Sequence, residues 1–296
     1  MTPFWEAAGG RLVDRVVRAG VPAAIFWLGG LALVPGGLTW LTGLSRGAPV
    51  IMLLVGALVG SAVLVNRLSP VALCLTRGPW RGPLKKLSRR RTAELSARVE
   101  ADELKWRELT AAVESDMATD EERAEYVRLK RRLSLSSADV AQHQPTRVGN
   151  LLSAAQARVH EKYGLDAVIT WPRLWLVLPE AAREEISSAR AALNSSAATL
   201  VWGLLFCGFT WWSWWALPIG VAVTVLTAWF WVPSRAANFA ALFEATYDLH
   251  RAALYEQMRW PIPMSPARER EQGRALTKYL QRGSDAPTPI FTNLAA

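Results

Sequence analysis

The sequence predicts an all-α polytopic membrane protein with two transmembrane helical hairpins, which together make four spans. Four apolar segments carry no charged residue: 21–44, 50–65, 197–217 and 218–232. A bilayer core of about 30 Å needs about 20 helical residues, and these segments reach or approach that length. Fifteen of the 296 residues are Trp, whose apolar ring and single N–H donor suit a membrane interface. Amphipathic helical spacing marks the polar regions between and after the hairpins.

The first hairpin, preceded by an amphipathic N-terminal segment, occupies residues 1–76. Pro35 should kink the first apolar run, because proline removes one backbone hydrogen bond of a helix. A tight connection at 45–49 leads to the second run, which is expected to extend toward Leu75. Gly56 and Gly60 stand four residues apart in that run and are interpreted as a helix-packing face.

A basic cluster follows the first hairpin directly and sets the predicted orientation. Lys and Arg concentrate on the cytoplasmic side of a span, whereas the 45–49 connection holds a single Arg. Both termini and the following domain are therefore expected to be cytoplasmic. Because each such side chain gains about 1 kcal/mol beside anionic lipid, we interpret the cluster as an anionic-lipid contact, with nucleic acid the less favoured partner. The cluster consists of Arg77, Arg81, Lys85, Lys86, Arg89, Arg90 and Arg91.

Residues 77–196 form the predicted cytoplasmic helical domain. Thr119 and Glu122 match a capping box, in which the two residues satisfy each other's free backbone N–H groups at a helix start. The amphipathic helices on either side should form an antiparallel hairpin, with a short coiled coil as one form of it. Further along, Thr146 should cap a helix that ends before Gly164.

The apolar segment 171–179 lies in this domain but is too short to span. We interpret three of its side chains as lying in the inner-leaflet headgroup region: Trp171, Arg173 and Trp175. Pro172 and Pro179 should prevent the segment from joining either neighbouring helix. The alternative, which the sequence leaves open, buries the segment against the other cytoplasmic helices, as a straight helix from Pro179 would require.

The second hairpin occupies residues 197–235, and its turn is expected within 213–218, beside an outer belt of Trp residues. The last apolar run, 218–232, would measure only about 22 Å as a helix. It therefore needs a locally thinner bilayer or an extension past Pro233. The C-terminal cytoplasmic segment, 236–296, should be helical to about 280, and its end, Asp285–Ala296, is predicted to be disordered.

Two parts of the second half of the chain resemble uncharacterised bacterial multi-span integral membrane proteins. The resemblance implies several spans and the bacterial inner (plasma) membrane, and it implies no activity. It is carried by the stretches 145–150, 162–175, 248–251 and 260–263, which read PTRVGN, KYGLDAVITWPRLW, DLHR and WPIP.

No residue pattern indicates catalysis, a cofactor or a metal site. The three histidines, at 143, 160 and 250, have no partner at metal-ligand spacing. Cys74 and Cys207 lie far apart and are interpreted as buried thiols. We therefore expect a protein that is not an enzyme and that binds no cofactor.

Two functions remain as hypotheses. In the first, the cytoplasmic helices 92–133 and 236–280 bind a protein partner or another copy of the chain, while membrane lipids contact the spans. In the alternative, several copies form an oligomeric channel or pore, because four short spans cannot enclose an aqueous path. Hydroxyl side chains would line it, although hydroxyls on spanning helices also serve packing: Thr199, Thr210, Ser213, Thr224 and Thr227. The charge-free runs argue against an ion-coupled transporter.

Overall fold

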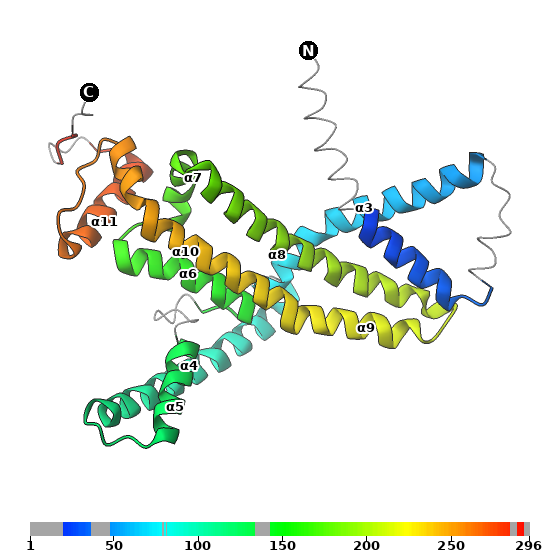
Figure 1. Cartoon of the computed structure of the whole chain (residues 1–296), viewed down its shortest axis with the longest axis horizontal. Helices are drawn as coiled ribbons and strands as arrows, with labels where there is room; N and C mark the ends of the chain where they lie inside the picture. The colour runs from blue at the N-terminus through cyan, green and yellow to red at the C-terminus, as the bar shows by residue number, and fades with distance from the viewer. Residues whose placement is uncertain are drawn as a thin grey trace, which may run out of the picture. The chain divides into compact units, whose positions relative to one another are not determined.

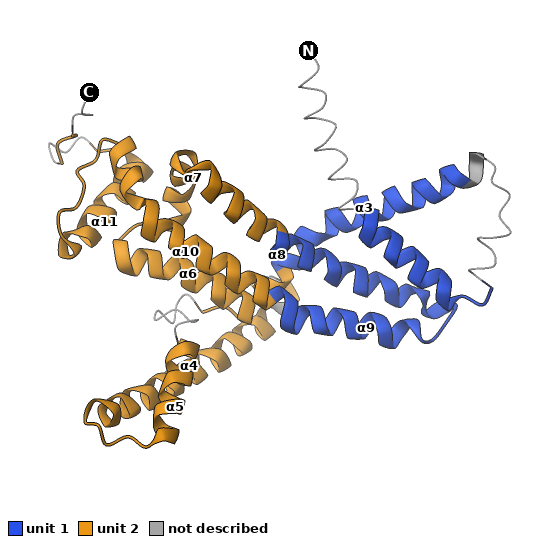
Figure 2. Ribbon diagram, viewed as in Figure 1, with its two compact units in different colours: residues 1–74, 192–232 blue, residues 75–191, 233–296 orange. Residues whose placement is uncertain are grey.

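The computed structural model describes residues 20–36, 48–78, 80, 82–133, 143–284 and 289–292. Throughout this described part the regular structure is helical, and no strand occurs (Figure 1). Two compact units divide the chain (Figure 2). Unit 1 comprises residues 1–74 and 192–232, and unit 2 comprises residues 75–191 and 233–296. Each unit is thus built from segments that lie far apart in the sequence.

Three helices of the described chain are long and apolar enough to cross a membrane: Ile51–Arg77, Glu180–Trp211 and Ala216–Gln257. These findings are consistent with a membrane protein. The first predicted span is represented by a shorter apolar helix, Gly20–Leu33. The rest of that run, residues 37–44, lies outside the described residues, so the structure supports three of the four predicted spans.

The helix Gly20–Leu33 ends before Pro35, where the sequence predicted a kink. The Val34 N–H donates to the Leu31 carbonyl at 3.2 Å, and Gly36 follows with a left-handed φ of 75°. Proline disfavours the helical conformation of the residue before it. Val34 therefore leaves the helix, and the run is interrupted by a turn instead of a bend.

Helix α3 (Ala48–Arg77) carries the second apolar run and contains Pro70. Its inward contacts within unit 1 include the Ser61 hydroxyl, which accepts a hydrogen bond from Trp27 Nε1 at 3.2 Å. Val65 is 3% exposed and packs with Ala23 and Val201. Most of the larger side chains of α3 instead face outward, and Cys74 is exposed, which corrects the expectation that its thiol is buried.

Helices α8 (Glu180–Phe206) and α9 (Ala216–Leu226) are joined by the 3₁₀ turn η3 (Cys207–Trp211) and a short turn at 212–215. The turn thus comes slightly earlier than the predicted 213–218. Pro218 lies in the first turn of α9, where its missing N–H would have no helical partner. Trp211 and Trp214 are 89% and 69% exposed at this end of the hairpin.

One continuous helical path leads from α9 into α10 (Val232–Gln257) through the π-helical turn η4 (Thr227–Trp231). The Val232 N–H donates to the Thr227 carbonyl, five residues earlier. A proline in an α-helix clashes with the carbonyl four residues before it, and a π turn changes that spacing. The wider turn just before Pro233 therefore accounts for the helix passing through proline. The helix of the short last run continues past Pro233, which is one of the two alternatives that the sequence left open.

In unit 2 the helices α4 (Lys85–Glu114) and α5 (Asp120–Leu133) form an antiparallel hairpin, after the 3₁₀ turn η1 (Gly82–Leu84). The rings of Trp106 and Tyr126 stack with centroids 6.1 Å apart. The predicted capping box is confirmed: Thr119 N–H donates to Glu122 Oε2 at 2.8 Å, and Glu122 N–H donates to Thr119 Oγ1 at 3.3 Å. The structure does not establish a coiled coil.

Helix α6 (Arg147–Tyr163) begins and ends where the sequence predicted. The Thr146 hydroxyl accepts a hydrogen bond from the Gly149 N–H at 3.0 Å. Gly164 adopts a left-handed φ of 70°, and its N–H donates to the His160 carbonyl. Both caps are confirmed, because each depends on residues within four positions of the helix end.

The predicted interfacial segment forms a helix, α7 (Ala167–Val177), capped by the Asp166 carboxylate. Pro172 lies inside this helix, so the expectation that it separates the segment from its neighbours is wrong at that residue. Leu174 is fully buried and Leu178 is 3% exposed. They belong to the core of unit 2, which α6, α10 and α11 (Pro266–Arg282) complete.

The chain end was predicted to be disordered, and four of its residues, 289–292, are described. The Thr292 N–H donates to the Arg259 carbonyl at 2.9 Å. The Phe291 ring lies 5.9 Å from the ring of Tyr279 and 6.3 Å from that of Trp260. For these residues the prediction is wrong, because an aromatic side chain gives the tail an apolar anchor.

Candidate functional site

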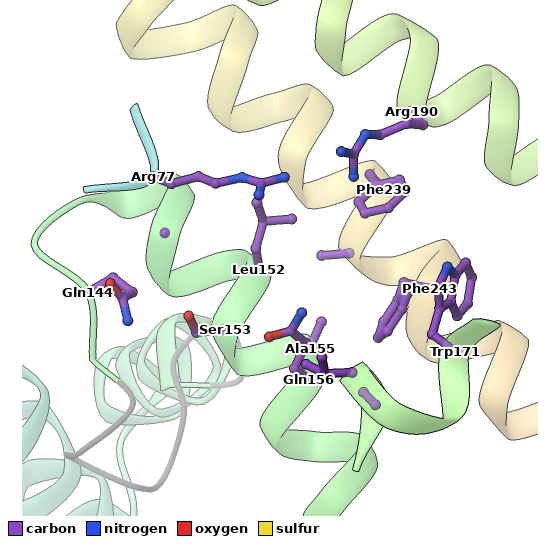
Figure 3. A pocket seen from close by; sticks show the side chains of 14 residues that line it. Arg77, Gln144, Leu152, Ser153, Ala155, Gln156, Trp171, Arg190, Phe239 and Phe243 are labelled. Atoms are coloured by element: carbon purple, nitrogen blue, oxygen red, sulfur yellow. The ribbon is translucent and has the colours of Figure 1, made fainter. Parts of the chain in front are cut away.

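A cavity of about 440 Å³ lies within unit 2 (Figure 3). This volume falls in the range that small-molecule sites occupy in proteins. The end of α3, the segment before α6, and the helices α6, α7, α8 and α10 supply its walls. The lining residues that matter for its chemistry are Arg77, Ser153, Trp171, Arg190, Phe239 and Phe243.

Two arginines line the cavity, and Figure 3 shows their guanidinium groups pointing toward one another. Arg77 is the last residue of α3, and Arg190 comes from α8. The Arg190 guanidinium lies over the Phe239 ring, 5.5 Å from its centroid, a distance at which a cation is attracted to an aromatic face. Among the described residues that line the cavity, none is acidic.

The backbone at Arg77 is held in place by the start of α6. A Cβ atom on Gly149 would lie 2.0 Å from the Arg77 carbonyl oxygen, so only glycine allows this approach. Gly78 has a φ of 93°, in the left-handed region that favours glycine. The chain can therefore turn sharply after α3 and bring Arg77 to the cavity.

The opposite wall is aromatic. The Trp171 ring lies 4.7 Å from the ring of Phe243, which lies 6.4 Å from that of Phe239. Aromatic pairs at such separations add attraction beyond the area that they bury. The cavity thus combines two cations with an apolar wall, an arrangement that suits an anion bearing an apolar group.

A polar network next to this core joins α6, α10 and α11. The Tyr163 hydroxyl donates to Asp248, and the Arg251 guanidinium lies over the Tyr163 ring at 4.2 Å. Arg251 Nε in turn donates to Glu269 Oε1 at 2.6 Å. Burial raises the pKa of the Tyr163 phenol to about 12, and the hydrogen bond to Asp248 adds to this. The phenol therefore stays protonated at neutral pH and remains a donor.

A second part of the network centres on Glu244, which accepts from Arg158 at 2.7 Å and from Lys162 at 2.6 Å. The Glu244 side chain is only 16% exposed. Paired charges of this kind offset the cost of burying a carboxylate. The network holds α6 against α10, so we assign it a structural role.

The residues of the predicted basic cluster do not all lie in the same surroundings. Arg77 lines the cavity, and Arg81 lies outside the described residues. The others are exposed along α4, and their contact with anionic lipid stays a prediction: Lys85, Lys86, Arg89, Arg90 and Arg91.

Two of the three side chains that were predicted to be interfacial pack against the core of unit 2. Trp171 and Trp175 are partly buried against its core, 5.8 Å from one another. Arg173 Nη1 donates to the Ile169 carbonyl of its own helix at 2.7 Å. This packing corresponds to the buried alternative, and any membrane contact of the three side chains remains untested.

The predicted packing glycines, Gly56 and Gly60, are exposed, and no described atom lies within 4 Å of a Cβ built on either. Close helix packing occurs elsewhere in unit 1. A Cβ on Gly220 would lie 2.6 Å from Cys207 Sγ and 2.8 Å from the Gly203 carbonyl oxygen. Gly203 and Cys207, like Gly220 and Thr224, have the same four-residue spacing, so spacing alone does not distinguish these positions from Gly56 and Gly60.

Three of the five hydroxyl groups that were considered for a pore donate hydrogen bonds to carbonyl groups three or four residues earlier in the chain. Thr199 Oγ1 donates to the Ser195 carbonyl at 3.1 Å, and Thr224 Oγ1 donates to that of Gly220 at 2.8 Å. Thr210 Oγ1 donates to the Cys207 carbonyl at 2.6 Å. Such bonds satisfy a hydroxyl without water, so these residues give the channel alternative no support.

Across the described residues, no group of three or more His, Cys, Asp or Glu side chains could hold a metal ion. His143 is 6% exposed, and its Nδ1 lies 3.0 Å from the Ser96 hydroxyl. Compared with protein-family models, with curated proteins and with solved structures, the chain matches none. A function must therefore be argued from the residues themselves.

Proposed function

We propose that the protein is a membrane-anchored binding protein whose α4–α5 hairpin docks a protein partner or a second copy of the chain. The observation that carries this proposal is the exposure of apolar side chains on an otherwise highly charged hairpin. Leu104 and Val127 are 62% and 61% exposed, and Met117 is 80% exposed. Exposed apolar side chains in a polar surround are typical of interaction sites when they form a patch.

Between the two helical regions that the sequence suggested for binding, we favour the α4–α5 hairpin over the helices 236–280. Several large apolar side chains of the helices 236–280 serve the core of unit 2, although Leu249 is 76% exposed. Phe243 is 8% exposed, Leu254 is 1% exposed and Leu276 is fully buried. Docking through these side chains would require the unit to open, whereas the hairpin presents its side chains without rearrangement.

The hairpin is also well ordered internally, which lowers the entropy that binding would cost. Asp102 pairs with Arg132 at 3.0 Å and Glu125 with Lys105 at 2.6 Å, so both ion pairs link α4 to α5. The hydrogen bond between Ser96 and His143 ties α4 to the segment before α6.

The experiment is site-specific photocrosslinking in cells with a photoreactive amino acid at Leu104 of the full chain. We expect a discrete adduct that weakens when Val127→Glu is added. The mass of the adduct separates self-association, at twice the chain mass, from a different partner. Met264, which is 97% exposed and lies off the hairpin, is the matched control position. Absence of a discrete adduct at Leu104, or an equal pattern at Met264, would overturn the proposal.

We further propose that the hairpin faces the cytoplasm, because the basic residues from Lys85 to Arg91 follow a span directly. Topology reporters fused at residues 120 and 290 should both report the cytoplasm, and a reporter at residue 46 should report the outside. An external signal at residue 120 would reverse the orientation.

A further inference from the structure

We propose that the cavity of unit 2 is a binding site for the phosphate group of an anionic phospholipid, held by Arg77 and Arg190. This site is separate from the docking hairpin and does not depend on it. The proposal rests on the charge of the cavity, on its apolar wall and on the place of its arginines along their own helices.

The charge of the cavity favours an anion. Two arginines line it without an acidic lining residue among those described, and their guanidinium groups point toward one another (Figure 3). Like charges that face one another repel, and a phosphate between them would reverse that repulsion. Arginine forms paired hydrogen bonds to phosphate oxygens, which makes it the side chain best suited to this ligand.

The apolar wall favours an anion that carries a hydrocarbon group. Trp171, Phe239 and Phe243 supply aromatic surface, and Leu152 and Ala155 add aliphatic surface. A free phosphate ion would leave this wall unused. The start of an acyl chain or the glycerol backbone of a lipid would instead cover it, while Ser153 and Gln156 remain as further polar groups of the lining.

The position of each arginine along its helix favours a lipid over a soluble metabolite. Arg77 ends the apolar helix Ile51–Arg77. Arg190 stands seven residues before Ala197, where the apolar part of α8 begins. Those residues correspond to about 10 Å of helix, and the headgroup layer adds about 5–8 Å to each side of a bilayer core. An arginine side chain can span the remaining distance, so both guanidinium groups fall within reach of lipid phosphates.

The test measures lipid binding to the full-length protein by native mass spectrometry from detergent, with phosphatidylglycerol and phosphatidylcholine compared at equal concentration. We expect one saturable phosphatidylglycerol molecule per chain, with phosphatidylcholine at least tenfold weaker. Arg190→Gln should weaken phosphatidylglycerol binding about tenfold, as the loss of one charge-assisted hydrogen bond implies. Arg190→Lys should recover part of the affinity, because it restores the charge.

The matched control is the double variant Arg98→Gln, Arg128→Gln, which removes two exposed positive charges from the α4–α5 hairpin, outside the predicted lipid-contact cluster. It should bind phosphatidylglycerol as the natural chain does. An equal loss in this control would show that general surface charge attracts the lipid, and it would overturn the proposal. Competition by soluble glycerol phosphate at the same concentration as the lipid would overturn the lipid as ligand.

Arg77→Gln is a second, independent test of whether phosphatidylglycerol binds in the cavity. Its backbone contact with Gly149 does not involve the side chain, so the turn after α3 should persist. Circular dichroism checks the helical content of both variants. If both arginine variants keep their helical content and bind phosphatidylglycerol unchanged, the cavity is not the site.

Discussion

The two compact units differ in how they place many of their large apolar side chains. In unit 2, Leu174 and Leu276 are fully buried and Leu254 is 1% exposed. In unit 1, Leu53 is 67% exposed, Val59 is 56% exposed and Trp229 is 72% exposed. Exposure of such side chains to water is unfavourable in free energy. Exposure to lipid tails, which are as apolar as leucine, has almost no such penalty. The difference is consistent with a membrane protein whose unit 1 carries the apolar surface that lipid would cover.

Both interiors contain glycines at close backbone approaches, such as Gly149 and Gly273 in unit 2, but their other contacts differ. The core of unit 2 contains large apolar side chains, and ion pairs such as that of Arg251 with Glu269 also link its helices. In unit 1 the helices approach at small residues, such as Gly203 and Gly220, and at rings, such as those of Phe26 and Trp202, 4.8 Å apart. Small residues allow the close backbone approach that drives helix association in lipid.

The largest expected effect tests the apolar core of unit 2. Leu174→Ala should lower the free energy of unfolding by about 3 kcal/mol, because it removes buried methyl groups and leaves a cavity. Leu176→Ala is the control, since this side chain on the same helix is 77% exposed, and it should cost less than about 0.5 kcal/mol. Denaturant unfolding of the purified chain, followed by circular dichroism, measures both. Equal losses would remove α7 from the core.

The next effect tests the packing of unit 1 in a matched pair. Gly220→Ala should destabilise by about 2 kcal/mol, because the added methyl group overpacks a tight contact. Gly56→Ala meets open space, and alanine favours a helix over glycine by about 1 kcal/mol. It should therefore be neutral or stabilising in the monomer. Thermal unfolding in detergent gives the comparison. If Gly56→Ala proved the more damaging variant, the face at Gly56 would be packed after all.

A smaller effect sharpens the picture of the hairpin. Thr119→Ala should weaken the start of α5 by about 1 kcal/mol, because it removes the side-chain half of the capping box. Thr119→Ser, which keeps the hydroxyl, should be nearly neutral. Hydrogen exchange at the first amides of α5 measures the effect locally. Unchanged protection in Thr119→Ala would mean that packing alone fixes that helix start.

The smallest effect is a pH dependence at the same cap. Hydrogen bonds from the Thr119 backbone N–H and hydroxyl lower the pKa of Glu122 below its ordinary value of 4.5. Because the pKa of Glu122 is lower in the folded protein than in the unfolded chain, its carboxylate stabilises the fold above pH 4.5. This stabilisation is lost as the pH falls through the pKa that Glu122 has in the folded protein. Exchange protection of α5 should therefore decline below pH 4.5. Glu122→Gln should remove that decline, and a decline of the same size in the variant would assign it to other groups.

Sequence reasoning succeeded where structure is decided locally. The caps at Thr146, at Gly164 and at Thr119 depend on side chains within four residues of the helix end, so their patterns can be read directly. The antiparallel pairing of α4 and α5 follows from the short link between two amphipathic helices. The long apolar helices could also be predicted from local sequence, because the length and composition of a segment define them.

The sequence could not show the contacts that distant segments of the chain decide. Burial of Trp171 depends on Phe243, more than seventy residues away along the chain. The two glycine motifs have the same spacing, and only the partner helix shows that Gly220 is packed while Gly56 is exposed. Likewise, Arg77 looked like one member of a basic run, and only the fold places it beside Arg190.

The central claim, that unit 1 lies in lipid and the α4–α5 hairpin in water, can be measured at two side chains of similar exposure. Leu53 of unit 1 is 67% exposed and Leu104 of the hairpin is 62% exposed. In a background with Cys74→Ser and Cys207→Ala, spin labels at each position are tested in reconstituted bilayers for collision with oxygen and with a water-soluble nickel chelate. The label at 53 should collide preferentially with oxygen and the label at 104 with the chelate. Preferential chelate collision at both positions would contradict the account.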